Sequence, residues 1–253
     1  MAPTHMRSAL KWAAGTFGVA VGAYAGYVGA TWLRYGHPAP ARGDDGDSLL
    51  DRLMPVYDVV ERRHVHVAAP ADITFAAAGE QDLMALPVVR AIFKAREVAL
   101  GSDSGTTTDP RGLLALTKSI GWGVLAEAPG REVVMGAVTQ PWKANVVFRP
   151  LPPHEFVAFD EADYVKIAWT LRTDPVGANA SIFRTETRAL ATDAAARAKF
   201  RRYWSFLSPG IILIRWVALG SLKREAERRF RSGRPDRGRR PGFDAHLARR
   251  DEA

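Results

Sequence analysis

Arg184, Glu186 and Arg188 alternate along a segment that reads as a β-strand, and they are the residues best suited to chemistry. A carboxylate and a guanidinium facing a cavity would act as a general acid–base group and an anion clamp. The same alternation is typical of a strand face that meets water. We interpret the three side chains as a solvated ladder of charges, with the acid–base pair as the alternative.

His64 and His66 share one face of a predicted strand and could begin a metal site. No third ligand is evident, the chain has no cysteine, and no His/Glu zinc motif occurs. The segment 101–105 resembles a nucleophile elbow only superficially, since Asp103 takes the middle position. There is no phosphate loop, dinucleotide fingerprint or recognisable triad. The sequence therefore predicts no metal and no cofactor.

A second kind of site would be apolar. Large side chains on one strand and one helix would line a ligand cavity or fill a core. The candidate ligand-binding residues are Trp142, Trp169, Phe200, Tyr203, Trp204, Leu207 and Ile211. Small strand residues beneath them would leave room for a guest: Gly136, Ala137, Ala158, Ala168 and Ala189.

The elements that must position these residues follow from periodicity and turn signals. We predict strands over 55–67, 122–128, 132–139, 145–149, 154–160, 163–173 and 180–191. Helices are expected over about 71–83, from Pro87 onward, and from Thr192 onward with an interruption at Pro209-Gly210. A meander this long must bury one face, and the terminal helix is its large amphipathic partner. The predicted class is α+β.

Several phrases resemble the START-like superfamily, also called SRPBCC or helix-grip proteins, and within it a bacterial group. They are Tyr57-Asp58-Val59, Ala68-Ala69-Pro70-Ala71, Leu125-Ala126-Glu127, Pro129-Gly130-Arg131-Glu132, Thr185-Glu186-Thr187-Arg188, Ala191-Thr192-Asp193, Phe200-Arg201-Arg202-Tyr203-Trp204 and Leu213-Ile214-Arg215. The resemblance covers about residues 54–230. It implies a curved antiparallel sheet gripping a long C-terminal α-helix, with a cavity between them. The superfamily includes lipid carriers, hormone receptors and aromatase/cyclase enzymes, so this fold does not fix a function.

The first 35 residues are expected to form a transmembrane anchor, followed by a polar linker over 36–53. Residues 12–33 carry no charge, and a 22-residue helix of about 33 Å matches a hydrocarbon core of about 30 Å. A cleaved signal peptide is the alternative, because Ala23-Tyr24-Ala25 would suit the peptidase. Gly18, Gly22 and Gly26 lie on a ridge of small residues that would admit a transmembrane helix partner.

Much of the formal charge of +8 lies near the C-terminus, where seven arginines fall between Arg228 and Arg240. Residues 231–253 are expected to be a basic, disordered tail that meets anionic lipid headgroups or only solvent. Nucleic acid is the less favoured partner, since Phe230 is the one aromatic residue among these arginines and none follows before Phe243.

These features together predict a START-like domain at 54–230, tethered to the cell membrane by one helix. Its function would be to bind a small lipophilic molecule, lipid-, sterol- or polyketide-like, in an internal cavity. A cyclase- or hydrolase-like enzyme and a non-catalytic protein-interaction module are the alternatives. The count of basic residues flanking the anchor leaves the side of the membrane open.

Overall fold

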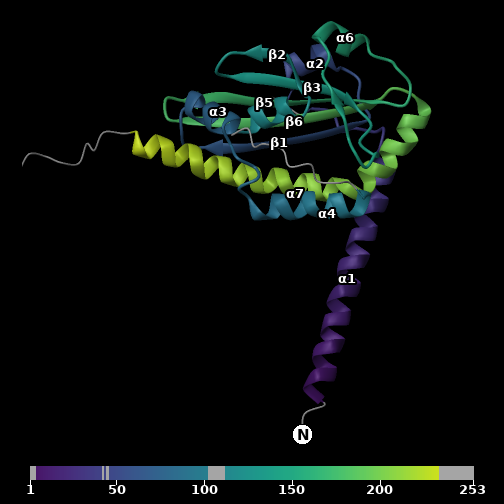
Figure 1. The fold of residues 1–253 in the computed structure, drawn as a ribbon. Coiled ribbons are helices and arrows are strands. Elements are labelled where there is room, and N and C mark those ends of the chain that lie inside the picture. Colours follow the sequence, from purple (N-terminus) through teal and green to yellow (C-terminus); the bar gives the residue numbers. More distant parts are fainter. Residues whose placement is uncertain (1–3, 42, 44–45, 102–111, 234–253) are drawn as a thin grey trace, which may run out of the picture.

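An antiparallel sheet forms the centre of the molecule in a computed structural model, which describes residues 4–41, 43, 46–101 and 112–233 (Figure 1). Its strands are β1 (Val59–Val67), β2 (Gly123–Ala128), β3 (Glu132–Thr139), β4 (Phe148–Arg149), β5 (Val165–Gly177) and β6 (Ala180–Ala191). The strand order is β1-β6-β5-β3-β2, with β4 paired to β3. The sheet is curved, and every pairing is antiparallel. The predicted α+β class is therefore confirmed.

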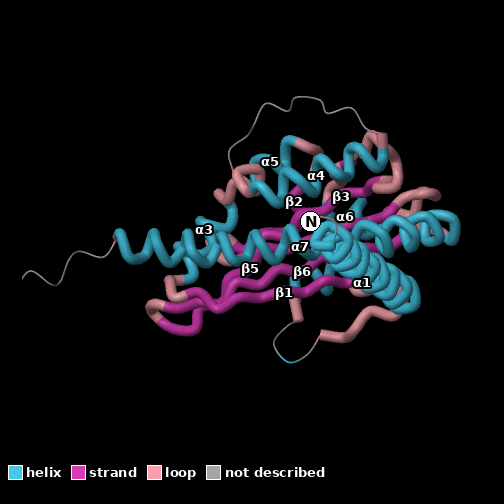
Figure 2. The backbone as a smooth tube through the Cα atoms, turned by 90° about the horizontal axis from the view of Figure 1, so that it is seen from below, coloured by secondary structure: helices cyan, strands magenta, loops and turns pink. Residues whose placement is uncertain are grey.

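Helices cover both faces of this sheet. They are α1 (Thr4–Arg34), α2 (Ser48–Leu53), α3 (Ala71–Gly79), α4 (Pro87–Leu100), α5 (Leu113–Ser119), α6 (Pro153–Ala158) and α7 (Ala194–Ser232). Figures 1 and 2 show α3, α4, α5 and α7 on one face, while α2 and α6 lie on the other. Helix α1 extends away from the α7 side of the molecule (Figure 1). We call the α7 side the inner face of the sheet and the α2 side the outer face.

The long helix α7 begins at Asp193, whose side chain accepts a hydrogen bond from the backbone N–H of Ala196 at 2.7 Å. The predicted interruption at Pro209-Gly210 is wrong, because the helix continues through both residues. A proline inside a helix removes one backbone donor and bends the axis rather than ending the helix when packing on either side holds it. Figure 1 shows the corresponding change of direction along α7.

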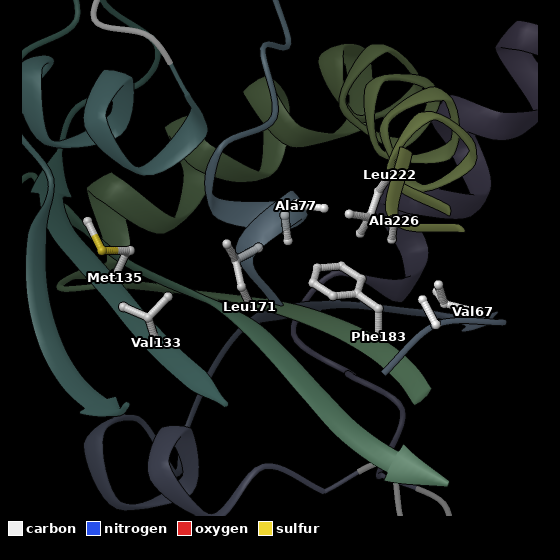
Figure 3. Packing of buried hydrophobic residues seen from close by; sticks show 10 residues of the cluster. Val67, Ala77, Val133, Met135, Leu171, Phe183, Leu222 and Ala226 are labelled. Atoms are coloured by element: carbon white, nitrogen blue, oxygen red, sulfur yellow. The ribbon is translucent and has the colours of Figure 1, made fainter. Parts of the chain in front are cut away.

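Two packed clusters hold α7 against the inner face, one toward each end of the helix. Toward its C-terminal end, Leu222 and Ala226 contact α3 and the strand residues Leu171 and Phe183 (Figure 3). Toward its N-terminal end, Ala196 and Phe200 pack with Tyr35 of the chain after α1 and with β1, β5 and β6. The sheet therefore grips α7 at two separated places.

The outer face is packed without room to spare. Leu50 and Met54 of the α2 segment and Phe156 of α6 are buried against β2, β3 and β5. Gly136 is required there, since a Cβ at that position would lie 2.2 Å from Leu125 Cδ1 and 3.3 Å from Phe156 Cε2. The segment expected to be a polar linker thus contributes a helix and core residues to the domain.

Three further sequence interpretations change. Residues 154–160, predicted as a strand, belong mostly to α6, because Pro153 occupies the first turn of a helix and favours it. Helix α5 was not predicted. The strand expected to end at residue 173 is longer: β5 runs to Gly177, and its last residues pair with β6 in a hairpin. The basic segment from residue 234 onward lies outside the described residues.

A buried carboxyl pair at the edge of the outer face couples folding to pH. Glu132 is buried, and its protonated carboxyl donates a hydrogen bond to Asp47, the N-cap of α2. Burial and the neighbouring Asp47 charge raise the pKa of Glu132 to about 8, against the opposing effect of Arg172 and Arg131.

The raised pKa predicts that stability falls as pH rises from about 4.5 toward 8. In this window the unfolded glutamate has lost its proton while the folded one retains it, so unfolding releases a proton. Glu132→Gln should flatten the decline in melting temperature between pH 5 and pH 8. Glu127→Gln, at an exposed position of β2, should keep the wild-type slope. A Glu132→Gln variant with the unchanged slope would contradict the assignment.

Candidate functional site

A large cavity lies between the inner face of the sheet and helices α4, α5 and α7. Its volume is about 870 Å³, within the range of small-molecule sites. The walls are mostly apolar: Trp169 and Leu171 come from β5, Phe183 and Ala189 from β6, Leu113 and Leu116 from α5, and Ile211, Ile214 and Ala218 from α7.

The space exists because of how α7 is held. Phe200 and Leu222 line the two ends of the cavity and also belong to the two packed clusters. Between them, Ile211, Ile214 and Ala218 face the cavity instead of the sheet. A helix that is fixed at two separated places over a curved sheet leaves a space between its central turns and the concave face of the sheet. The cavity is therefore a product of the architecture.

Helix α4 borders the mouth of the cavity. Arg90, Phe93 and Lys94 line it and are themselves exposed, so the space opens beside this helix. Helix α4 meets α7 at Gly210, where a Cβ would lie 3.1 Å from Ile92 Cγ2. The absence of a side chain at Gly210 therefore permits the close approach of the two helices.

Five of the seven predicted ligand-binding residues line this cavity: Trp169, Phe200, Tyr203, Trp204 and Ile211. Trp142 and Leu207 are not among its lining residues. Trp142 packs against the cluster at the start of α7, where the Lys199 ammonium lies 5.6 Å from its ring centroid. Leu207 is half-buried on α7 and does not line the cavity.

Sequence reasoning missed most of the remaining wall. The lining residues of α4 and α5, together with Trp122, Thr185, Thr187 and Arg215, were not proposed. The alternation of Phe183, Thr185, Thr187 and Ala189 on one side of β6 could have found the threonines. Of the five small strand residues expected to create space, Ala189 alone lines the cavity, and the space at Gly136 is filled from the outer face by Leu125.

The predicted solvent ladder of charges is wrong. Glu186 and Arg188 are 4% and 1% exposed, covered by the α2 segment. The Arg188 guanidinium donates to Glu186 Oε1 at 2.7 Å, to Asp51 Oδ1 at 2.6 Å and to the Met54 carbonyl at 2.8 Å. Arg62 adds a second pairing to Glu186 at 2.9 Å. Because a strand alternates its faces and Thr185 and Thr187 line the cavity, this charge network lies behind it.

The acid–base alternative therefore loses its residues. Among the described lining residues, Glu97 is the single carboxylate, it pairs with Lys94 at 3.6 Å near the mouth, and no histidine is present. His64 and His66 are exposed on β1 with ring centroids 6.1 Å apart. No group of three or more metal-ligating side chains occurs within the part of the chain that the structure describes.

No protein-family model and no curated protein sequence matches the chain. Solved structures similar to the chain include norcoclaurine synthase from Thalictrum flavum in complex with dopamine and hydroxybenzaldehyde (TM-score 0.28, 12% identity, 74% of this chain and 98% of that one). The Zhui aromatase/cyclase from Streptomyces sp. R1128 (0.24, 16%, 68% and 94%) and a START superfamily protein from Mycobacterium smegmatis (0.24, 13%, 68% and 97%) are two others. At such scores the similarity says nothing of ligand or activity, and the helix-grip arrangement rests on the chain's own strand order and long helix.

The buried network behind the cavity yields a stability prediction. Arg188→Met should cost about 3–5 kcal/mol, because it leaves Glu186 buried with one cation fewer. Arg228→Met is the comparison at a solvent-exposed pair, with Glu225 on α7, and should cost less than about 1 kcal/mol. Urea unfolding of the full chain measures both. Equal costs would mean that the network does not depend on its buried guanidinium.

Proposed function

We propose that this protein binds a small lipophilic molecule in the inner-face cavity while α1 tethers it to a membrane as a single-pass protein. The cavity is the observation that carries the proposal. Its apolar walls favour an apolar guest by roughly 25 cal/mol for each Å² removed from water. Aromatic and aliphatic side chains surround the space from every element, which suits a lipid-, sterol- or polyketide-like skeleton.

The tether rests on the shape of α1. This helix is continuous over its uncharged run at 12–33 and extends away from the domain (Figure 1). Its last eleven residues lie against the first half of α7: the Tyr24 hydroxyl donates to the Phe206 carbonyl at 2.7 Å, and Arg201 donates to the Trp32 carbonyl at 2.7 Å. Gly18, Gly22 and Gly26 have open space around them, which leaves their ridge available to a helix partner.

The thickness of a hydrocarbon core implies that, in the proposed arrangement, part of the domain near α1 would lie at the bilayer surface. Residues 12–23 precede the first contact with α7 and span only about 18 Å, too short for a hydrocarbon core of about 30 Å. If the whole uncharged run is to lie in hydrocarbon, the neighbouring part of α7 must sink into the interface. Interfacial helices lie about 5–10 Å deep at this boundary.

The outward stripe of α7 suits that position. We define it as Phe206, Leu213 and Trp216, which recur at intervals of seven and three, opposite the cavity-lining residues, and are exposed. Trp216 is 71% exposed. The same stripe continues into exposed arginines at both ends, Arg202 before it and Arg224 after it, which would meet anionic headgroups.

By length and composition, α7 is the one helix among the described residues that is apolar enough to cross a membrane, and 22% of its apolar window is buried. The Ala- and Gly-rich α1 falls short of that composition, so its role as the tether is proposed from its uncharged length and its direction away from the domain. The two packed clusters show it to be the gripped helix of the domain. Its apolar excess is accounted for by having two apolar faces, one on the cavity and one outward. With the outward stripe in the leaflet, the mouth beside α4 would take its guest from lipid.

Filling the cavity should abolish binding without unfolding the domain. In Ile214→Trp the indole ring would occupy the space beneath α7. In Leu213→Trp the indole ring would lie on the outward stripe instead. Purified full chain in lipid nanodiscs should retain a co-purified lipophile by native mass spectrometry, as should Leu213→Trp. Ile214→Trp should lose it. Finding no lipophile, and no rise in melting temperature with palmitic acid, hexadecanol or cholesterol, would refute the proposal.

The chain's lack of cysteine makes depth directly measurable. Single Trp216→Cys and Val176→Cys variants can be labelled with an environment-sensitive fluorophore in nanodiscs. The emission of the label at position 216 should shift to shorter wavelength and be quenched by brominated lipid. The label at Val176, equally apolar and exposed at the end of β5, should report water. A water-exposed signal at 216 would remove the outward stripe from the membrane.

A further inference from the structure

One charged side chain in the apolar cavity has no role in the proposal so far. Arg215 projects from the middle of α7, where it is half-buried and lines the cavity. It donates from Nη1 to the Glu61 carbonyl at 3.1 Å and from Nη2 to the Thr187 hydroxyl. Glu61 and Thr187 face each other in the register of β1 and β6, so both acceptors lie at one place on the inner face.

The pairing of Arg215 differs from that of Arg188. Arg188, which is 1% exposed, has two carboxylates within 2.7 Å. Arg215 has no carboxylate within ion-pair distance among the described residues, and its two acceptors are neutral oxygens. Glu61 is the acid with the largest electrostatic effect on Arg215, but its carboxylate pairs with the Arg63 guanidinium at 2.7 Å. Burial accordingly lowers the pKa of Arg215 to about 10.

An uncompensated cation in an apolar cavity is costly unless an anion joins it. A guanidinium has five donors in a planar fork that matches the two oxygens of a carboxylate. Neutral acceptors engage two of these donors, which holds the side chain in place and leaves others for a ligand. Thr185 and Thr187 add hydroxyl groups to the same wall.

We propose that the cavity takes an amphiphile ending in a carboxylate, such as a long-chain fatty acid, with the carboxylate on Arg215 and the chain along the apolar walls. This inference rests on the proposed function and specifies its ligand class. The polar end would lie under the middle of α7, against β1 and β6. The chain would extend past Trp169 and Leu116 toward the mouth beside α4.

The test compares palmitic acid with hexadecanol, which has the same chain length without the charge. Full chain in zwitterionic nanodiscs should bind palmitate at least roughly tenfold more tightly than the alcohol, the preference expected of a hydrogen bond to a charged group. Arg215→Met should remove that preference by weakening palmitate and leaving the alcohol within about threefold. Arg52→Met, at an exposed arginine of α2 on the opposite face of the sheet, should keep it.

A second readout is independent of partitioning into lipid. With palmitate labelled with ¹³C at its carboxyl carbon, the bound signal should stay that of the ionised form to lower pH in the wild type than in Arg215→Met. The melting temperature of the unliganded variant verifies folding, and Arg215→Lys should restore part of the preference through its charge. Equal binding of acid and alcohol by the wild type would overturn this inference alone. Binding of neither would overturn the proposed function with it.

Discussion

The structure depends on a helix that is fixed at two ends over a concave surface. Phe200 and Leu222, about six turns apart on α7, are each locked into a cluster with the sheet. The curvature of the sheet then leaves the central turns of the helix without a packing partner. Side chains of ordinary size cannot close the gap, since Ile214 and Ala218 reach down from α7 while Thr187 and Ala189 reach up from β6. The size of the cavity follows from that separation.

The two faces of the sheet divide the burial of charge between them. The outer face buries Glu186 and Arg188 as a hydrogen-bonded network under α2, where the charges balance one another. The inner face carries threonines and aromatic rings and, from α7, a single guanidinium with neutral partners. The charges of the outer face are therefore paired within the chain, whereas Arg215 on the inner face has no carboxylate partner among the described residues.

Under the proposed function, the position of α1 would relate the cavity to the membrane. The Tyr27 hydroxyl lies 3.0 Å from Ser208 Oγ, and the Arg201 guanidinium lies 4.3 Å from the ring centroid of Trp32. These contacts join the two helices over several turns. A helix bound this way fixes the height of the domain above its own apolar segment. Helices α4 and α7 lie on the side of the sheet from which α1 leaves (Figures 1 and 2). In the proposed arrangement, delivery of an apolar guest would need no passage through water.

The sequence by itself determined the local elements. Alternation and turn residues predicted β2, β3 and β6. Helical spacing predicted that Phe200, Tyr203, Trp204 and Leu207 would share a face of one helix, and all but Leu207 line the cavity. Only the tertiary structure decided what each face meets. Periodicity cannot tell a charged strand face covered by α2 from one covered by water, which is why Glu186 and Arg188 were placed in solvent. It likewise cannot show that Arg215 lies under a sheet without a counterion, because burial and pairing are set by residues such as Glu61 that are distant in the chain.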